Sequence, residues 1–218
     1  MENKSPKYLL ADHSLWLLLF SNLITIFFAV KEEWGLSSVM WIYWFQSITI
    51  GIFNFVRILQ LKDFSTERFE INGQPARPTR GTKISTAFFF LFHYGFFHFV
   101  YLVFLLIGSI SSKFLGGGID VADTLYILLI ALLFFANHLF SFIYNKPRDT
   151  KKQNIGTLMF YPYARIIPMH LTIIFGLLIG KAALPFFLVL KTLADVIMHV
   201  TEHQDIRGGE EGQAEETT

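Results

Sequence analysis

Six long apolar runs, separated by shorter polar stretches, organise this chain of 218 residues. Each run stays apolar over about 20 residues and lacks both the alternation of a strand and the narrow stripe of a soluble amphipathic helix. A helix of about 20 residues crosses a hydrocarbon core of about 30 Å. The pattern therefore predicts an all-α polytopic bundle with six transmembrane helices. Their expected ranges are 9–30, 39–59, 84–107, 122–145, 157–180 and 182–203.

The polar stretches between and after the runs differ in chemistry. Residues 62–83 form the one substantial loop, in which Asn72 and Gly73 are expected to make a tight turn. Residues 207–218 are rich in Gly and Glu and are predicted to be a disordered acidic tail. A single domain, 1–206, is therefore expected to contain all six helices.

Composition also indicates a membrane protein. Hydrophobic residues make up 53% of the chain, and the mean hydropathy is +0.46. A soluble domain of this length does not need 25 Phe residues. Trp41, Tyr43 and Trp44, near the start of the second run, are expected to anchor it at the membrane interface. The absence of Cys excludes disulfides, thiolate metal sites and a Cys nucleophile.

The distribution of Lys and Arg predicts the orientation. Twelve of them lie in the N-terminal segment, the 62–83 loop, the 146–152 connection and the tail, against three in the alternate connections. Because cytoplasmic loops carry the excess of Lys and Arg, both termini are expected in the cytoplasm, in a multi-pass protein of the cell (inner) membrane. The expected partner is the lipid bilayer. The 62–83 loop has mixed charges and no aromatic ladder, so no nucleic-acid partner is expected.

Polar side chains inside the runs are the candidate functional residues, because they are costly in a membrane and usually face a bundle interior. Counting about 1.5 Å per residue from the cytoplasmic end of each helix places a group of them at one depth, in the inner half of the bilayer. We expect them to line a pocket that opens toward the cytoplasm. The group comprises Asn22, Asn54, His93, Asn137, His138, Arg165 and Asp195.

The last run carries ionisable residues at spacings of three and four, which places them in one stripe of a helix. They are Lys191, Asp195, His199, Glu202 and His203. Nitrogen and oxygen ligands four residues apart are a standard way for a helix to hold Zn²⁺ or Fe²⁺. Two alternatives stay open: a structural ion pair between Lys191 and Asp195, and a proton relay through the same residues.

Arg165 is the candidate anion-binding residue of the fifth run. It lies between Pro162 and Pro168, which are expected to kink the helix and to free backbone carbonyls. A guanidinium at this position can either clamp the anionic part of a substrate or pair with Asp195. Asp195 and Arg165 are therefore the predicted catalytic residues.

Histidines on other runs extend the candidate metal site. His93 shares the depth of Asp195, whereas His138 is equally suited to ligate a metal or to hydrogen-bond a neighbouring helix. The predicted Zn²⁺ site combines His93, His199 and His203 or Asp195, with His138 as a further candidate, and activates water. Haem b is the alternative cofactor, since histidines on different helices of a six-helix bundle can ligate it.

Three strings carry a resemblance to a known family. They are Tyr43-Trp-Phe-Gln-Ser-Ile-Thr-Ile-Gly51-Ile-Phe-Asn54-Phe-Val-Arg57, Phe92-His-Tyr-Gly-Phe-Phe-His98 and Lys191-Thr-x-x-Asp195-x-x-x-His199. They resemble an uncharacterised family of bacterial and archaeal polytopic integral membrane proteins. The resemblance covers most of the chain and implies no established activity.

A looser similarity concerns an acidic residue and the histidines. An acid followed by His-x3-His on a late helix, with another His on an earlier one, is similar to the alkaline ceramidase and adiponectin-receptor superfamily. Those proteins are seven-helix zinc hydrolases of lipid amides, and the similarity implies His93, His199 and His203 as ligands. This chain departs from them in having one helix fewer and no clearly placed Ser partner.

These patterns lead to three functional hypotheses. The first is a metal-dependent hydrolase that acts on a lipid-like small molecule from the cytoplasmic side, with Arg165 receiving its anionic part. The second is a proton-coupled transporter or carrier, in which Lys191, Asp195 and His199 relay protons. The third is a b-type haem-binding electron carrier.

Overall fold

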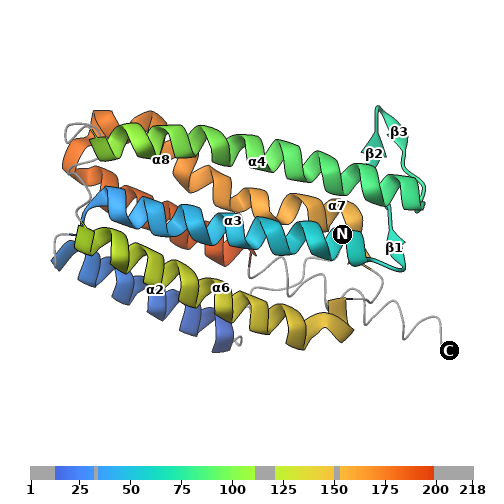
Figure 1. Cartoon of the computed structure of the whole chain (residues 1–218), viewed down its shortest axis with the longest axis horizontal. Coiled ribbons are helices and arrows are strands. Elements are labelled where there is room, and N and C mark those ends of the chain that lie inside the picture. Colours follow the sequence, from blue (N-terminus) through green and yellow to red (C-terminus); the bar gives the residue numbers. More distant parts are fainter. Residues whose placement is uncertain (1–12, 32–33, 111–120, 150–152, 199–218) are drawn as a thin grey trace, which may run out of the picture.

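A computed structural model of the chain describes residues 13–31, 34–110, 121–149 and 153–198. Most of these residues are helical, and the long helices run along the long axis of the molecule (Figure 1). The helices are α2 (His13–Lys31), α3 (Leu36–Gln60), α4 (Arg80–Ile110), α6 (Val121–Asp149), α7 (Ile155–Phe160), η1 (Tyr161–Arg165), α8 (Ile166–Ile179), η2 (Gly180–Ala182) and a last helix over 183–198. The predominantly helical architecture that the sequence predicts is confirmed.

Three described segments are long and apolar enough to cross a membrane. They are Leu36–Gln60, Arg80–Gly108 and Ile155–Gly176, which correspond to the second, third and fifth predicted runs. The other three runs also form helices: α2, α6 and helix 183–198. Three apolar helices of spanning length are therefore found, while the six crossings and their orientation stay predictions.

Helix α3 lies at the centre of the bundle. It packs against α4, α6, α7 and η1, and Figure 1 shows α4 on one side of it and α2 and α6 on the other. Its side chains Met40, Tyr43 and Ile58 are at most 1% exposed. Burial of these large side chains on one helix makes α3 the core against which the others pack.

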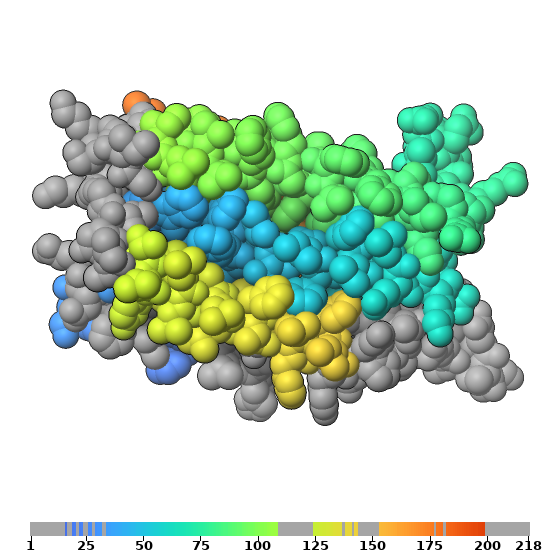
Figure 2. Space-filling view, in the orientation of Figure 1, coloured from blue at the N-terminus to red at the C-terminus, as the bar shows by residue number. Residues whose placement is uncertain are grey.

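The outward surfaces of α4 and α6 are apolar. Both helices flank α3 on the face shown in Figure 2. Phe92 and Phe96 on α4 are 72% and 62% exposed, and Leu132 on α6 is 64% exposed. An apolar surface of this extent is unusual in a soluble monomer and is what a lipid-facing surface requires.

Helix α4 starts four residues earlier than the predicted range 84–107, at Arg80. Thr79 caps it, because Thr79 Oγ1 accepts a hydrogen bond from the Thr82 N–H at 3.1 Å and the Thr79 carbonyl accepts one from the Lys83 N–H at 3.0 Å. The first turn is therefore polar. Hydrophobicity alone does not reveal such a turn.

The predicted 62–83 loop contains a small hairpin at one end of the bundle (Figure 1). Its two strands pair in antiparallel fashion, and the two residues between them, Asn72 and Gly73, have positive φ angles of 53° and 72°. Two consecutive residues with positive φ match the right-handed twist of a hairpin, so the predicted turn is confirmed. The hairpin strands are β2 (Glu70–Ile71) and β3 (Gln74–Pro75), and strand β1 (Phe64–Ser65) precedes them in the loop.

The loop is fastened to the start of α7. Strand β1 pairs in parallel with β4 (Gln153–Asn154). Asn154 Oδ1 accepts hydrogen bonds from the backbone N–H groups of Gly156 at 2.9 Å and Thr157 at 3.2 Å, which caps α7. The Asn154 side-chain amide donates to the Glu67 carbonyl at 2.8 Å. One side chain thus fixes where α7, and the η1 segment after it, begin.

Candidate functional site

The fifth predicted run is not one continuous helix. Helix α7 ends at Phe160, the 3₁₀ segment η1 follows, and α8 resumes at Ile166. Pro162 occupies the start of η1, where a residue without an N–H is tolerated, whereas inside an α-helix it breaks the ladder of hydrogen bonds. The predicted disruption is therefore confirmed. Arg165, the last residue of η1, lies where α8 begins.

The segment around η1 is held from two sides. On one side, the Asn54 side-chain amide of α3 donates to the Leu158 carbonyl at 2.9 Å. On the other, the Tyr161 hydroxyl donates to the Met198 carbonyl of helix 183–198 at 2.8 Å. These bonds tie the residues that precede Arg165 to both neighbouring helices.

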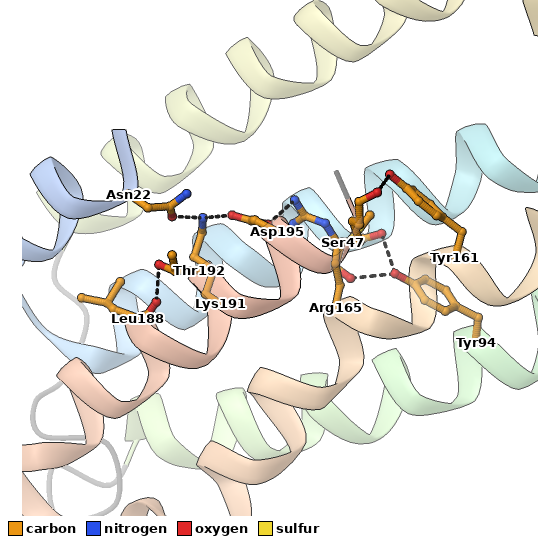
Figure 3. A network of polar contacts seen from close by, with 10 residues as sticks. Asn22, Ser47, Tyr94, Tyr161, Arg165, Leu188, Lys191, Thr192 and Asp195 are labelled. Atoms are coloured by element: carbon orange, nitrogen blue, oxygen red, sulfur yellow. Dashed lines mark hydrogen bonds and ion pairs between the residues drawn. The ribbon is translucent and has the colours of Figure 1, made fainter. Parts of the chain in front are cut away.

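Arg165, Lys191, Asp195 and Asn22 form a buried polar cluster, which we call the ion network (Figure 3). Arg165 Nη2 donates to Asp195 Oδ1 at 3.2 Å, and Lys191 Nζ donates to Asp195 Oδ2 at 2.5 Å. Lys191 Nζ also donates to Asn22 Oδ1 of α2 at 3.0 Å. The side chains of Arg165, Lys191 and Asp195 are only 10%, 20% and 11% exposed. The network therefore joins α2, η1 and helix 183–198 inside the bundle.

Arg165 has donor groups that the described part of the chain does not satisfy. Its Nε and Nη1 atoms are buried, and no described residue accepts a hydrogen bond from them. Its Cζ atom lies 5.1 Å from the ring centre of Tyr43, whose own buried hydroxyl likewise finds no partner among the described residues. Unsatisfied buried donors are rare and costly in folded proteins. They mark a position where the acceptor atoms of a ligand would be stabilised.

A second buried cluster joins α3 to α4. The Ser47 hydroxyl lies 2.9 Å from His98 Nε2 and 2.7 Å from the Tyr94 hydroxyl. His98 Nδ1 donates to the Tyr94 carbonyl at 2.9 Å, since a carbonyl can only accept, so Nε2 is the acceptor for Ser47. Trp44 Nε1 donates to the His98 carbonyl at 2.9 Å.

A Ser–His contact of this length also occurs between a nucleophile and its base. Here Ser47 and His98 are only 1% and 3% exposed, and the Ser47 oxygen is shared with Tyr94. A buried hydroxyl that makes two hydrogen bonds is poorly suited to attack a substrate. We therefore interpret the cluster as a clamp between α3 and α4.

Comparison with known proteins places the chain in a family. Residues 5–211 match the model of DUF6498, described as a family of unknown function. The chain belongs to this family. The predicted resemblance to a family without established activity is thereby confirmed. No curated protein and no solved structure matches this DUF6498 member, so the similarity to alkaline ceramidases finds no support.

Two of the predicted metal ligands of this DUF6498 member, His93 and His138, lie in separate places. His93 on α4 stacks on Phe89 with ring centres 5.1 Å apart, and its Nδ1 lies 2.8 Å from the Tyr163 hydroxyl. His138 on α6 stacks on Phe134 with ring centres 4.3 Å apart. The two imidazoles thus belong to different aromatic clusters.

The predicted metal site depends on residues beyond the described ranges. Within 13–31, 34–110, 121–149 and 153–198, no three His, Asp or Glu side chains are grouped as a metal ion requires. His199 and His203 lie outside these ranges. The Zn²⁺ and haem b sites therefore stay predictions.

The residues predicted to share one depth are only partly brought together. Asn22, Arg165 and Asp195 meet in the ion network, and Arg165 pairs with Asp195, which is one of the two roles expected for it. Lys191, expected nearer the midplane, also joins them. Asn54, by contrast, bonds to the backbone of α7.

The sequence does not predict that Tyr43 is part of the site. It is expected at the membrane interface, yet it is 1% exposed and lies against Arg165. Its spacing carries a usable signal: Tyr43, Ser47 and Asn54 are four and seven residues apart, which places them on one face of a helix. All three are buried.

Proposed function

We propose that this DUF6498 member is a multi-pass membrane protein that binds a small organic anion inside its helical bundle and carries it across the membrane. Arg165 supports the proposal most directly. Its side chain is 10% exposed, and its Nε and Nη1 atoms lack acceptors among the described residues. The oxygens of a carboxylate or sulfonate would accept from such a guanidinium at more than one nitrogen.

The charge of the ion network supports the same proposal. Arg165 and Lys191 are both in contact with the Asp195 carboxylate, so the contacting groups carry two positive charges and one negative. A buried charge without a counter-charge is costly. An anion bound beside Arg165 would neutralise the excess and satisfy the donors at once.

The interrupted helix gives a reason to prefer a carrier over an enzyme. Many membrane carriers bind their substrate where a helix is broken near the middle of the bundle. Here the break between α7 and α8 presents Arg165, and hydrogen bonds from Asn54 and Tyr161 hold the segment. The geometry suits reversible binding of an anion by Arg165.

The hydrolase and haem hypotheses require histidine ligands for a cofactor and have their own tests. A zinc enzyme predicts about one Zn per chain in detergent-purified protein, lost in His199→Ala. A haem carrier predicts a Soret absorption band. Either result would add a cofactor that anion binding by Arg165 does not require.

Transport is tested with benzenesulfonate, a permanently ionised monovalent anion that crosses lipid slowly. The full chain is reconstituted into liposomes, and uptake of the labelled anion is followed down its concentration gradient. Arg165→Gln removes the proposed anion-binding group. Arg68→Gln makes the same chemical change at a side chain that is 90% exposed, and serves as the matched control.

We expect uptake by the wild-type protein and Arg68→Gln to exceed that of protein-free liposomes. Arg165→Gln should reduce it at least about tenfold, because a buried anion loses its principal donor. Uptake by Arg165→Gln equal to that of wild type would contradict the proposal, as would wild-type uptake no faster than that of empty liposomes. Circular dichroism of each variant shows whether its helices are intact.

A further inference from the structure

We infer that the site selects monovalent over divalent organic anions, and that Asp195 sets this preference; the inference rests on the proposed function. Each oxygen of the Asp195 carboxylate is used for a different cation. Oδ1 accepts from Arg165 at 3.2 Å and Oδ2 accepts from Lys191 at 2.5 Å. Asp195 therefore acts as a built-in anion that cancels one of two positive charges.

Among the described residues, Asn22 and Tyr43 also contact the network and leave this count unchanged. Asn22, from α2, contributes a neutral amide oxygen to Lys191. Tyr43, from α3, presents the face of a neutral ring to Arg165, 5.1 Å from its Cζ atom. The described side chains of the network therefore carry a net charge of one positive unit inside the bundle.

Net charge determines which ligand such a site accepts. A monovalent anion brings the network to neutrality, whereas a divalent anion leaves it with an uncompensated negative charge. In a buried site, electrostatic interactions are several times stronger than in water, so an uncompensated charge opposes binding. The preference should therefore follow the net charge of the ion network, and substitution of a charged residue of the network by an uncharged one should alter it.

The surroundings of Arg165 indicate what the rest of the ligand is like. The Tyr43 ring beside the guanidinium packs edge-on against Phe187, with ring centres 5.3 Å apart. Both side chains are at most 1% exposed. Aromatic side chains next to a cationic group suit a ligand with an apolar or aromatic body. The inferred substrate class is therefore a monovalent acid anion, carboxylate or sulfonate, with an apolar body.

The test compares two permanently ionised probes: benzenesulfonate, which is monovalent, and benzene-1,3-disulfonate, which is divalent. Isothermal titration measures the dissociation constant of each for the full chain in detergent. Wild type should bind benzenesulfonate at least about tenfold more tightly than the disulfonate. Lys191→Met makes the contacting network neutral, and its affinity for benzenesulfonate should fall at least about tenfold.

Asp195→Asn raises the network to two positive charges, and the preference should shift toward the disulfonate. The double variant Lys191→Met/Asp195→Asn returns the network to one positive charge and should restore the preference for benzenesulfonate. Lys62→Met and Asp63→Asn are the matched controls, since both side chains are exposed, and they should leave the ratio unchanged.

The outcomes separate this inference from the proposed function. Equal affinities for the two probes in wild type, or an unchanged benzenesulfonate affinity in Lys191→Met, would overturn the inference while anion binding itself stands. No binding of either probe to wild type would overturn the proposed function. If Asp195→Asn does not fold, Lys191→Met alone decides, because it retains the Arg165–Asp195 pair.

Discussion

Two substitutions that each replace a charged residue of the ion network by an uncharged one are expected to have very different effects on stability. Asp195→Asn keeps the size of the side chain but removes the carboxylate between two buried cations. Lys191→Met keeps most of the aliphatic length but leaves Arg165 and Asp195 as a neutral pair. If the network carries an excess positive charge, Asp195→Asn increases that excess and Lys191→Met removes it.

The magnitudes follow from the distances. Contacts of 3.2 Å and 2.5 Å to the two carboxylate oxygens place the cations about 6–8 Å apart, where their repulsion is about 2–3 kcal/mol at an effective dielectric constant of about 20. Removing one partner of a buried pair typically costs about 3–5 kcal/mol. We therefore expect Asp195→Asn to lower the free energy of unfolding by about 3–5 kcal/mol. Lys191→Met loses hydrogen bonds to Asn22 and Asp195 but also removes the repulsion with Arg165, so its net cost should be at most about 1–2 kcal/mol.

Reversible unfolding in mixed detergent micelles, followed by circular dichroism, measures both values. Asp63→Asn is the matched control for the loss of a carboxylate, because Asp63 is exposed, and should change stability by less than about 0.5 kcal/mol. An equal loss of stability in Lys191→Met and Asp195→Asn would contradict an excess positive charge in the ion network. It would show that Asp195 and Lys191 balance each other and that no positive charge is left over.

Two further predictions concern the scaffold that holds the site, and the same unfolding assay measures both. A Cβ atom on Gly51 would lie 2.5 Å from Cε1 of the Tyr94 ring, so Gly51→Ala should cost about 1–3 kcal/mol. Gly95→Ala meets no described atom within 4 Å and should be neutral or stabilising; equal losses would contradict the close packing of α3 on α4. Asn154→Ala removes the cap of α7 and the bond to the Glu67 carbonyl, and should cost about 1–2 kcal/mol. Asn154→Asp keeps the capping oxygen and should recover part of that loss, so a variant as unstable as Asn154→Ala would argue against capping.

The sequence locates the helices because hydrophobic length is a local property. All six predicted runs contain helix in the described residues. The ends are less well predicted, since they depend on single polar side chains. Thr79 extends α4 by a polar turn, and Pro162 divides the fifth run into α7, η1 and α8. Only the second of these features carries a clear signal in the sequence.

The site is only partly predictable because it depends on how the helices rotate about their axes. Depth along the helix brings Arg165 and Asp195 to the same level, and they do pair. The bond between Lys191 and Asn22 joins residues 169 positions apart, and no local pattern indicates it. Tyr43 has an ambiguous signal, since a Tyr near a helix end suits the interface and the core equally well.

The most direct test of the central claim is whether a monovalent anion binds to the Arg165 guanidinium. Protein labelled with ¹⁵N-arginine is titrated with benzenesulfonate in micelles, and the Nε–H resonance of Arg165 is identified by its absence in Arg165→Gln. Its Nε–H has no acceptor among the described residues. We predict a saturable shift of this resonance to lower field, while the exposed Arg68 resonance stays unchanged. An Arg165 resonance that does not move as the anion binds would contradict the account.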